Sequence, residues 1–215
     1  MYFITGTDTN IGKTLISAIL TLKLRTTYFK PIQSGDLETG GDTAIVKSLT
    51  RLPDEHFLNP AYALNAPLSP HLSARYDSKV IDLNKIIEKI KNTPLSRPLI
   101  IEGAGGVYVP VNDKEYIIDL IAMTGFEAII VARSELGTLN HTFLTIEALR
   151  ARNIPIKGVI LNGETNIENQ KTITAYSNIP ILGHIPIQKS LSYEVIESLG
   201  ELVTIDMAWE SHDKI

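Results

Sequence analysis

The chain has 215 residues, of which 44% are hydrophobic and 20% charged, enough to bury the core of one α/β domain. Its 20 Lys and Arg against 24 Asp and Glu, without a run of five like charges, argue against binding to nucleic acid or a membrane surface. The absence of cysteine excludes disulfides, thiol nucleophiles and cysteine-ligated metal centres, and fits a cytoplasmic protein. We see no signal-like start and no apolar stretch approaching the length of a membrane span.

Short apolar runs rich in Ile, Val and Phe recur and are predicted as strands. They are Tyr2–Thr5, Thr27–Lys30, Leu99–Glu102, Ala128–Ala132, Lys157–Leu161 and Pro180–His184. Helical patterns lie between several of them: Leu15, Ile19 and Leu22; Ile86, Ile87 and Ile90 behind Asp82 as a cap; and Phe143–Leu149. Because strands buried on both faces are continuously apolar, we predict a doubly wound, mainly parallel α/β sheet flanked by helices.

Two segments lack periodicity. Leu58–Pro70 holds three prolines and is predicted as a long loop, placed to cover an active site. The end of the chain from Gly200 to Ile215 shows no clear pattern and is predicted as a loosely ordered tail, although Trp209 suggests some docking. We therefore expect one domain over residues 1–215.

A glycine-bearing turn follows the first strand and opens a helix, with the sequence Gly6-Thr7-Asp8-Thr9-Asn10-Ile11-Gly12-Lys13-Thr14. This context favours a phosphate-binding P-loop over a plain turn with an exposed lysine. Five residues separate the two glycines where the standard spacing is four, but the Gly12-Lys13-Thr14 end is intact. We predict a P-loop NTPase-like fold in which Lys13 neutralises phosphates and the Thr14 hydroxyl ligates Mg²⁺. The predicted nucleotide contacts are Thr9, Asn10, Ile11, Gly12, Lys13, Thr14 and Leu15.

Two acidic residues are candidates for further magnesium ligands. Glu102 ends an apolar strand and precedes Gly103-Ala104-Gly105-Gly106, which indicates close approach of a ligand or backbone, with an ordinary solvated acid as the alternative. Asp42 follows Gly40-Gly41 and is explained equally well as a helix N-cap.

Lys30 ends the second predicted strand and precedes Pro31-Ile32-Gln33-Ser34-Gly35. Ligands of doubly wound sheets bind beyond the carboxyl ends of the strands, so we expect Lys30 and Ser34 to face the same crevice as Lys13. Taken alone, Lys30 is better explained as an ordinary surface lysine at a strand end, because most lysines are exposed.

Several motifs occur in a specific order. They are Gly6-Thr7-Asp8-Thr9 before Gly12-Lys13-Thr14, Lys30-Pro31 with Ser34-Gly35, Glu102-Gly103-Ala104-Gly105-Gly106, and Leu136-Gly137 with Asn140-His141. With shorter echoes at Ser69-Pro70-His71, Asn162 and Ile185-Pro186, the chain resembles the dethiobiotin synthetase family from Thr5 to Pro186. The resemblance implies a homodimeric cyclo-ligase that depends on ATP and Mg²⁺. Such an enzyme closes a ureido ring on 7,8-diaminopelargonic acid with CO2, through a carbamic-phosphoric anhydride, and yields dethiobiotin, ADP and phosphate.

The resemblance also implies residue roles. Lys13 and Lys30 would hold the γ-phosphate and the carbamate, Ser34 would bond to the carbamate, and Thr14, Asp42 and Glu102 would surround the metal. Gly137, Thr138, Leu139 and Asn140 would receive the substrate carboxylate across the dimer interface. The free N–H groups of a helix start favour an anion there, but a plain capping loop explains the segment equally well. Asn162 would contact adenine, although asparagine before glycine is commonly a turn.

Other functions remain as alternatives. The main one is a P-loop switch that hydrolyses nucleotide to partition cargo or regulate assembly. Such proteins usually carry a signature lysine near the position of Asp8, where this chain has an acid, and some carry an amphipathic C-terminal helix that is lacking here. An amide ligase with a glutaminase domain would require a cysteine nucleophile, and a scaffold without chemistry has no evident need for two lysines and a metal-ligand set.

Overall fold

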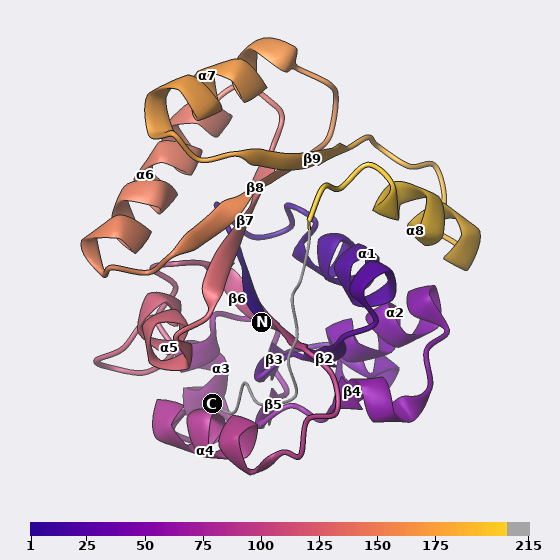
Figure 1. Cartoon of the computed structure of the whole chain (residues 1–215). Helices are drawn as coiled ribbons and strands as arrows, with labels where there is room; N and C mark the ends of the chain where they lie inside the picture. The colour runs from indigo at the N-terminus through magenta and orange to yellow at the C-terminus, as the bar shows by residue number, and fades with distance from the viewer. Residues whose placement is uncertain (206–215) are drawn as a thin grey trace.

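The computed structural model describes residues 1–205, in which a central parallel sheet lies between two layers of helices (Figure 1). The sheet has seven strands in the order β4-β2-β6-β1-β7-β8-β9, and all neighbouring strands are parallel. Their bounds are β1 Tyr2–Gly6, β2 Thr27–Phe29, β4 Phe57–Leu58, β6 Leu99–Gly106, β7 Glu127–Arg133, β8 Ile156–Asn162 and β9 Ile181–Ile185. Each strand predicted from the sequence is confirmed, and so is the parallel sheet.

A second, two-stranded parallel sheet joins β3 (Ile32–Ser34) to β5 (Tyr62–Leu64). The prediction of one long loop over Leu58–Pro70 is therefore wrong in part, because β5 lies inside it and Pro70 begins a helix. Three residues are too few to display alternation, and β5 forms because β3 offers it a partner in the register Ile32 to Tyr62.

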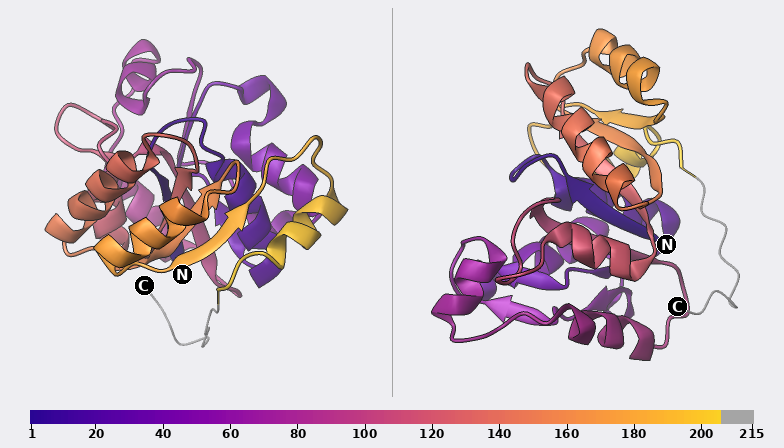
Figure 2. Two further views of the ribbon diagram at one scale, coloured as in Figure 1. Left: turned by 90° about the horizontal axis from the view of Figure 1, so that it is seen from above. Right: turned by 90° about the vertical axis from the view of Figure 1, so that its left-hand side faces the viewer.

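Helices cover both faces of the sheet (Figure 2). They are α1 Lys13–Leu24, α2 Gly41–Thr50, α3 Pro70–Tyr76, α4 Leu83–Asn92, α5 Ile117–Thr124, α6 Thr138–Ala151, α7 Ile167–Ser177 and α8 Tyr193–Gly200, with short 3₁₀ turns η1 Leu37–Thr39 and η2 Asp54–His56. Alternation along β1 assigns its side chains to the two layers: Tyr2 and Ile4 pack with α1, α2 and α8, whereas Phe3 packs with α4, α5 and α6. The doubly wound architecture is thereby confirmed.

The order in which the strands are connected indicates which edge of the sheet would bind a ligand. From β1 the chain passes through α1 to β2 on one side, and later it passes from β6 across β1 to β7 on the other. The winding direction thus reverses around β1, and such a reversal opens a crevice beyond the carboxyl ends of the strands. The β1–α1 loop and the ends of β2 and β6 all lie at this edge.

The last described residues return to the sheet. Val203 forms a bridge with Gly183 of β9, and both Val203 and Ile205 are buried. The remainder of the predicted tail, including Trp209, lies outside the described residues. Within residues 1–205 no helix has the length and apolar character needed to cross a bilayer.

Candidate active site

The loop between β1 and α1 is held from the side by β8. Asn10 and Gly12 adopt positive φ angles of 56° and 95°. At Gly12 a side chain would also collide with the amide of Asn162, so glycine is required there on two grounds. The Asn162 amide in turn donates to the carbonyl of Ile11 at 2.9 Å. The end of β8 therefore fixes the turn that leads into α1.

Lys13 begins α1 and is only 7% exposed. Its Nζ donates to the carbonyl of Asp8 at 2.9 Å. Burial and then the charge of Lys30 lower the pKa of Lys13 to about 8, and the nearby carboxylates offset only part of this effect. An anionic ligand would supply the missing counter-charge, as the phosphates of a nucleotide do in a P-loop.

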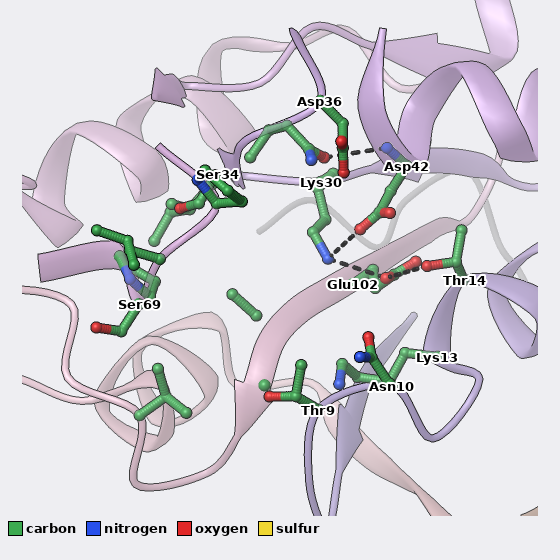
Figure 3. Close-up of a pocket in the computed structure, with 18 of the residues that line it drawn as sticks. Thr9, Asn10, Lys13, Thr14, Lys30, Ser34, Asp36, Asp42, Ser69 and Glu102 are labelled. Atoms are coloured by element: carbon green, nitrogen blue, oxygen red, sulfur yellow. Dashed lines mark hydrogen bonds and ion pairs between the residues drawn. The ribbon is translucent and has the colours of Figure 1, made fainter. Parts of the chain in front are cut away.

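Lys30 is a buried residue, not a surface lysine. Its Nζ lies 2.6 Å from Oδ2 of Asp42 and 2.9 Å from Oε1 of Glu102, and it also donates to the carbonyl of Gly103 at 3.0 Å. Figure 3 shows the ammonium group between the two carboxylates. Burial alone lowers the pKa of Lys30, but Glu102 and Asp42 outweigh it and raise that pKa. Conversely, burial alone raises the pKa of the Asp42 carboxyl, but the charge of Lys30, together with hydrogen bonding to the neighbouring side chains, outweighs burial and lowers that pKa.

The predicted metal ligands meet at this cluster. The Thr14 hydroxyl donates to Oε1 of Glu102 at 3.0 Å. Asp42, in the first turn of α2, contacts the ammonium group of Lys30, which also contacts Glu102. Gly40, rather than Asp42, is the N-cap of α2. A hydroxyl and two carboxylates are hard oxygen donors and fit Mg²⁺. No group of three or more acidic, histidine or cysteine side chains gathers within residues 1–205, so phosphate and water oxygens would complete the coordination.

These groups line one cavity of about 870 Å³. Among the predicted residues it is lined by Thr9, Asn10, Gly12, Lys13, Thr14, Lys30, Ser34, Asp42 and Glu102. Ser34 and Ser69 lie on the wall opposite the phosphate loop (Figure 3). The Ser34 hydroxyl is buried and bonds to no group of the described chain, which leaves it available to a ligand.

The other predicted contacts lie away from this cavity. Ile11 and Leu15 pack into the core, and Asn162 lies behind the phosphate loop. Gly137 caps α6 and lines a separate hollow of about 60 Å³ together with Thr138, while Leu136 beside it is fully exposed. In a single chain the structure does not bring the segment 137–140 to Lys30 and Ser34.

Three residues in or directly behind the cavity were not among the predicted site residues. The Tyr28 hydroxyl donates to Oε2 of Glu102 at 2.9 Å. Its place in the middle of a predicted strand was a usable signal, because a buried hydroxyl needs a partner. The Gln33 amide oxygen accepts the backbone N–H of Asp42 at 3.1 Å, and no pattern pointed to it. Ser69 was noted only within the motif Ser69-Pro70-His71.

The parallel sheet, the glycine loop at the start of α1 and the lysine that it presents define a P-loop nucleotide-binding protein. In agreement, the chain matches the AAA domain family over residues 1–195. Its fold is similar to that of the cell division ATPase MinD of Pyrococcus furiosus, with a TM-score of 0.57, 14% identity and coverage of 93% of this chain and 96% of that one.

Sequence relatives narrow the assignment. The chain is 45% identical to the ATP-dependent dethiobiotin synthetase BioD of Brucella ovis over 191 residues, which are 89% of this chain and 88% of that protein. It is 47% identical over 211 residues to the biotin biosynthesis bifunctional protein BioCD of Bordetella avium, covering 98% of this chain but only 44% of that longer protein. The chain belongs to the dethiobiotin synthetase family.

Proposed function

We propose that this enzyme carboxylates 7,8-diaminopelargonic acid with CO2 and closes the ureido ring at the expense of ATP. The products are dethiobiotin, ADP and phosphate. The observation that carries the proposal is the meeting of Lys13, Lys30, Ser34 and the oxygen donors around Glu102 in one cavity. Two lysines beside a hydroxyl suit a reaction in which a phosphoryl group and a carbamate carry negative charge together.

Three steps lead to the product. One amine of the substrate takes up CO2 as a carbamate and releases a proton. A carbamate oxygen then attacks the γ-phosphorus, the bond to the β-phosphate oxygen breaks, and ADP leaves. Finally the second amine attacks the carbonyl carbon of the mixed anhydride and loses a proton, the bond from that carbon to the phosphate oxygen breaks, and the ring closes as phosphate departs. No step forms a bond to the protein, so the residues act through position and charge.

The residues divide this work. Lys13 neutralises the terminal phosphates, Lys30 contacts both the γ-phosphate and the carbamate, and Ser34 donates its free hydroxyl to the carbamate. Thr14, Asp42 and Glu102 would hold Mg²⁺, which supplies positive charge to the phosphate oxygens when bound. For Lys30 this means exchanging at least one carboxylate for a ligand oxygen.

A second copy of the chain completes the site in this proposal. The N–H groups at the start of α6, over residues 137–140, would receive the substrate carboxylate from the partner. Two observations support this role: α6 begins with an exposed glycine N-cap, and Leu136 beside it is fully exposed. Converting the substrate carboxylate to an amide should raise KM markedly.

The test is phosphate release from ATP and Mg²⁺ with bicarbonate, in the presence and absence of diaminopelargonic acid, with detection of dethiobiotin by mass spectrometry. We expect release to depend on the diamine and to match product formation. Steady release without the diamine and without product would instead assign the chain to the nucleotide switches, whose fold it shares.

A further inference from the structure

Strand geometry places a tyrosine behind the predicted metal ligand. In the parallel pairing of β2 with β6, Tyr28 lies opposite Ile100. Since side chains alternate along a strand, Lys30 and Glu102, each two residues further on, point to the same face as this pair. That face packs against α1 and α2, which contribute Thr14 and Asp42.

The two carboxylate oxygens of Glu102 have different partners. Oε1 accepts from the Thr14 hydroxyl at 3.0 Å and from Lys30 at 2.9 Å, both of which line the cavity. Oε2 accepts from the hydroxyl of Tyr28 at 2.9 Å. Tyr28 is fully buried and does not line the cavity, so this bond reaches Glu102 from the side away from the ligand space.

Tyr28 is itself held rigidly. It belongs to β2, which pairs with β4 and β6 on its two sides, and its ring meets Phe57 edge-on at 6.4 Å between centroids. A glutamate side chain, by contrast, rotates easily about its last torsion angle. The phenol therefore selects the carboxylate rotation that directs Oε1 toward Thr14 and Lys30.

We propose that Tyr28 is a positioning residue that orients Glu102 for the magnesium-bound nucleotide. The importance of Tyr28 for catalysis rests on the proposed function. Its direct effect is on the affinity for the Mg²⁺-bound nucleotide, which can be measured without the reaction. Without the phenol, Oε2 is left buried and unpaired, and the carboxylate turns or recruits water. Groups that hold a metal ligand in place typically contribute 10–100-fold to metal affinity or activity.

The test compares the wild type with Tyr28→Phe, which removes only the hydroxyl. A non-hydrolysable ATP analogue is titrated into each protein by calorimetry, once with excess Mg²⁺ and once with EDTA. We expect Tyr28→Phe to weaken binding about 10-fold or more with Mg²⁺ and to leave binding in EDTA within about 2-fold of wild type. Equal losses in both conditions, or no loss, would overturn the proposal.

Tyr193→Phe is the matched control, because Tyr193 also donates to a glutamate, Glu197, at 3.0 Å, but on the exposed face of α8. It should bind the analogue as the wild type does in both conditions. A second measurement excludes a merely structural effect: with Glu102→Gln already present, adding Tyr28→Phe should cause little further loss of Mg²⁺-dependent binding. Additive losses would show that Tyr28 does not act through Glu102.

The dethiobiotin assay separates this inference from the proposed function. If the wild type makes dethiobiotin and Tyr28→Phe binds the Mg²⁺-bound analogue normally, the positioning role alone fails. If the wild type makes no dethiobiotin but Tyr28→Phe loses Mg²⁺-dependent binding, the positioning role holds and the ligase proposal fails.

Discussion

At the scale of single residues, Lys13 and Lys30 line one cavity, yet folding shifts their pKa values in opposite directions. Lys30 is flanked by two carboxylates, whereas the ammonium group of Lys13 donates to the neutral backbone carbonyl of Asp8. Without ligand, Lys13 therefore destabilises the folded state and Lys30 stabilises it. Both effects are measurable in the free protein.

Lys13→Met should stabilise the free protein at neutral pH. The difference between a pKa of 10.5 and about 8 corresponds to about 3 kcal/mol of destabilisation by the charged lysine. Because the unfolded chain binds more protons between these values, wild-type stability gains from rising pH there, and the advantage of the variant shrinks. Urea unfolding at about pH 7 and about pH 9.5 checks this, with at least half of the advantage lost at the higher pH. A constant advantage would contradict the lowered pKa.

Lys30→Met should have the opposite effect on stability. Its removal leaves the buried carboxylate of Glu102 and the half-buried carboxylate of Asp42 without this cation, at a cost of about 3 kcal/mol. Added Mg²⁺ should recover more stability in this variant than in the wild type, because the metal replaces the missing charge between the carboxylates. Thermal unfolding with and without Mg²⁺ measures both effects. Equal responses to Mg²⁺ in the two proteins would argue against a shared cation position.

The same position has a kinetic consequence. Since Lys30 is proposed to contact the transition state through the γ-phosphate and the carbamate, Lys30→Ala should lower kcat by a larger factor than it weakens ATP binding. Steady-state kinetics together with ATP binding separates the two effects. An unchanged kcat would exclude Lys30 from the chemistry.

At the scale of elements, the sequence predicted those parts whose burial leaves a periodic pattern. The long apolar strands around Ile101 and Ile130 were predictable because both of their faces are covered. By contrast, β3, β4 and β5 have two or three residues each and exist only through pairing with distant segments, which no local pattern encodes. The phosphate loop could be predicted from the sequence because its glycine, lysine and threonine are consecutive in the chain and need no distant partner to be recognised.

The residues around Glu102 could be predicted one by one as candidate site residues, but their contacts with one another could not. These side chains come from β6, α1, α2 and the end of β2. That Lys30 is only 5% exposed cannot be inferred from one lysine after a strand. The roles of Tyr28 and Gln33 depend on bonds to residues already in the cluster. Such contacts become visible only once the strands are in register.

Asp82, predicted from the sequence as a helix cap, contributes a measurable part of the free energy of unfolding. The Asp82 side chain accepts the backbone N–H of Asn84 at 2.9 Å and caps α4, which lies away from the cavity. Asp82→Ala should destabilise the protein by about 1 kcal/mol, because the first turn of the helix loses an acceptor. Urea unfolding measures the loss, and product formation should stay unchanged. A loss of activity at full folding would show that α4 influences the site.

At the scale of the whole molecule, the residues proposed to bind the phosphate and the carbamate line one cavity, and the start of α6 lines another. One chain therefore offers two parts of the proposed site that do not meet within it. A symmetric dimer brings such parts together if each copy presents its α6 start to the cavity of the other. This arrangement makes a prediction about mixtures of two defective chains.

Lys30→Met removes the phosphate and carbamate contact, and Asn140→Asp places a negative charge where the substrate carboxylate would bind. The aspartate suits the first turn of α6, so the fold should tolerate it. In mixed dimers one of the two sites is intact, because both defects fall in the other. Mixed and refolded chains should recover about a quarter of wild-type activity at low substrate concentration. Asn84→Asp, an equivalent change in the first turn of α4, is the control and should be fully active on its own. Activity no higher than the average of the two separate variants would place the whole site within one chain and remove the dimer from the proposed mechanism.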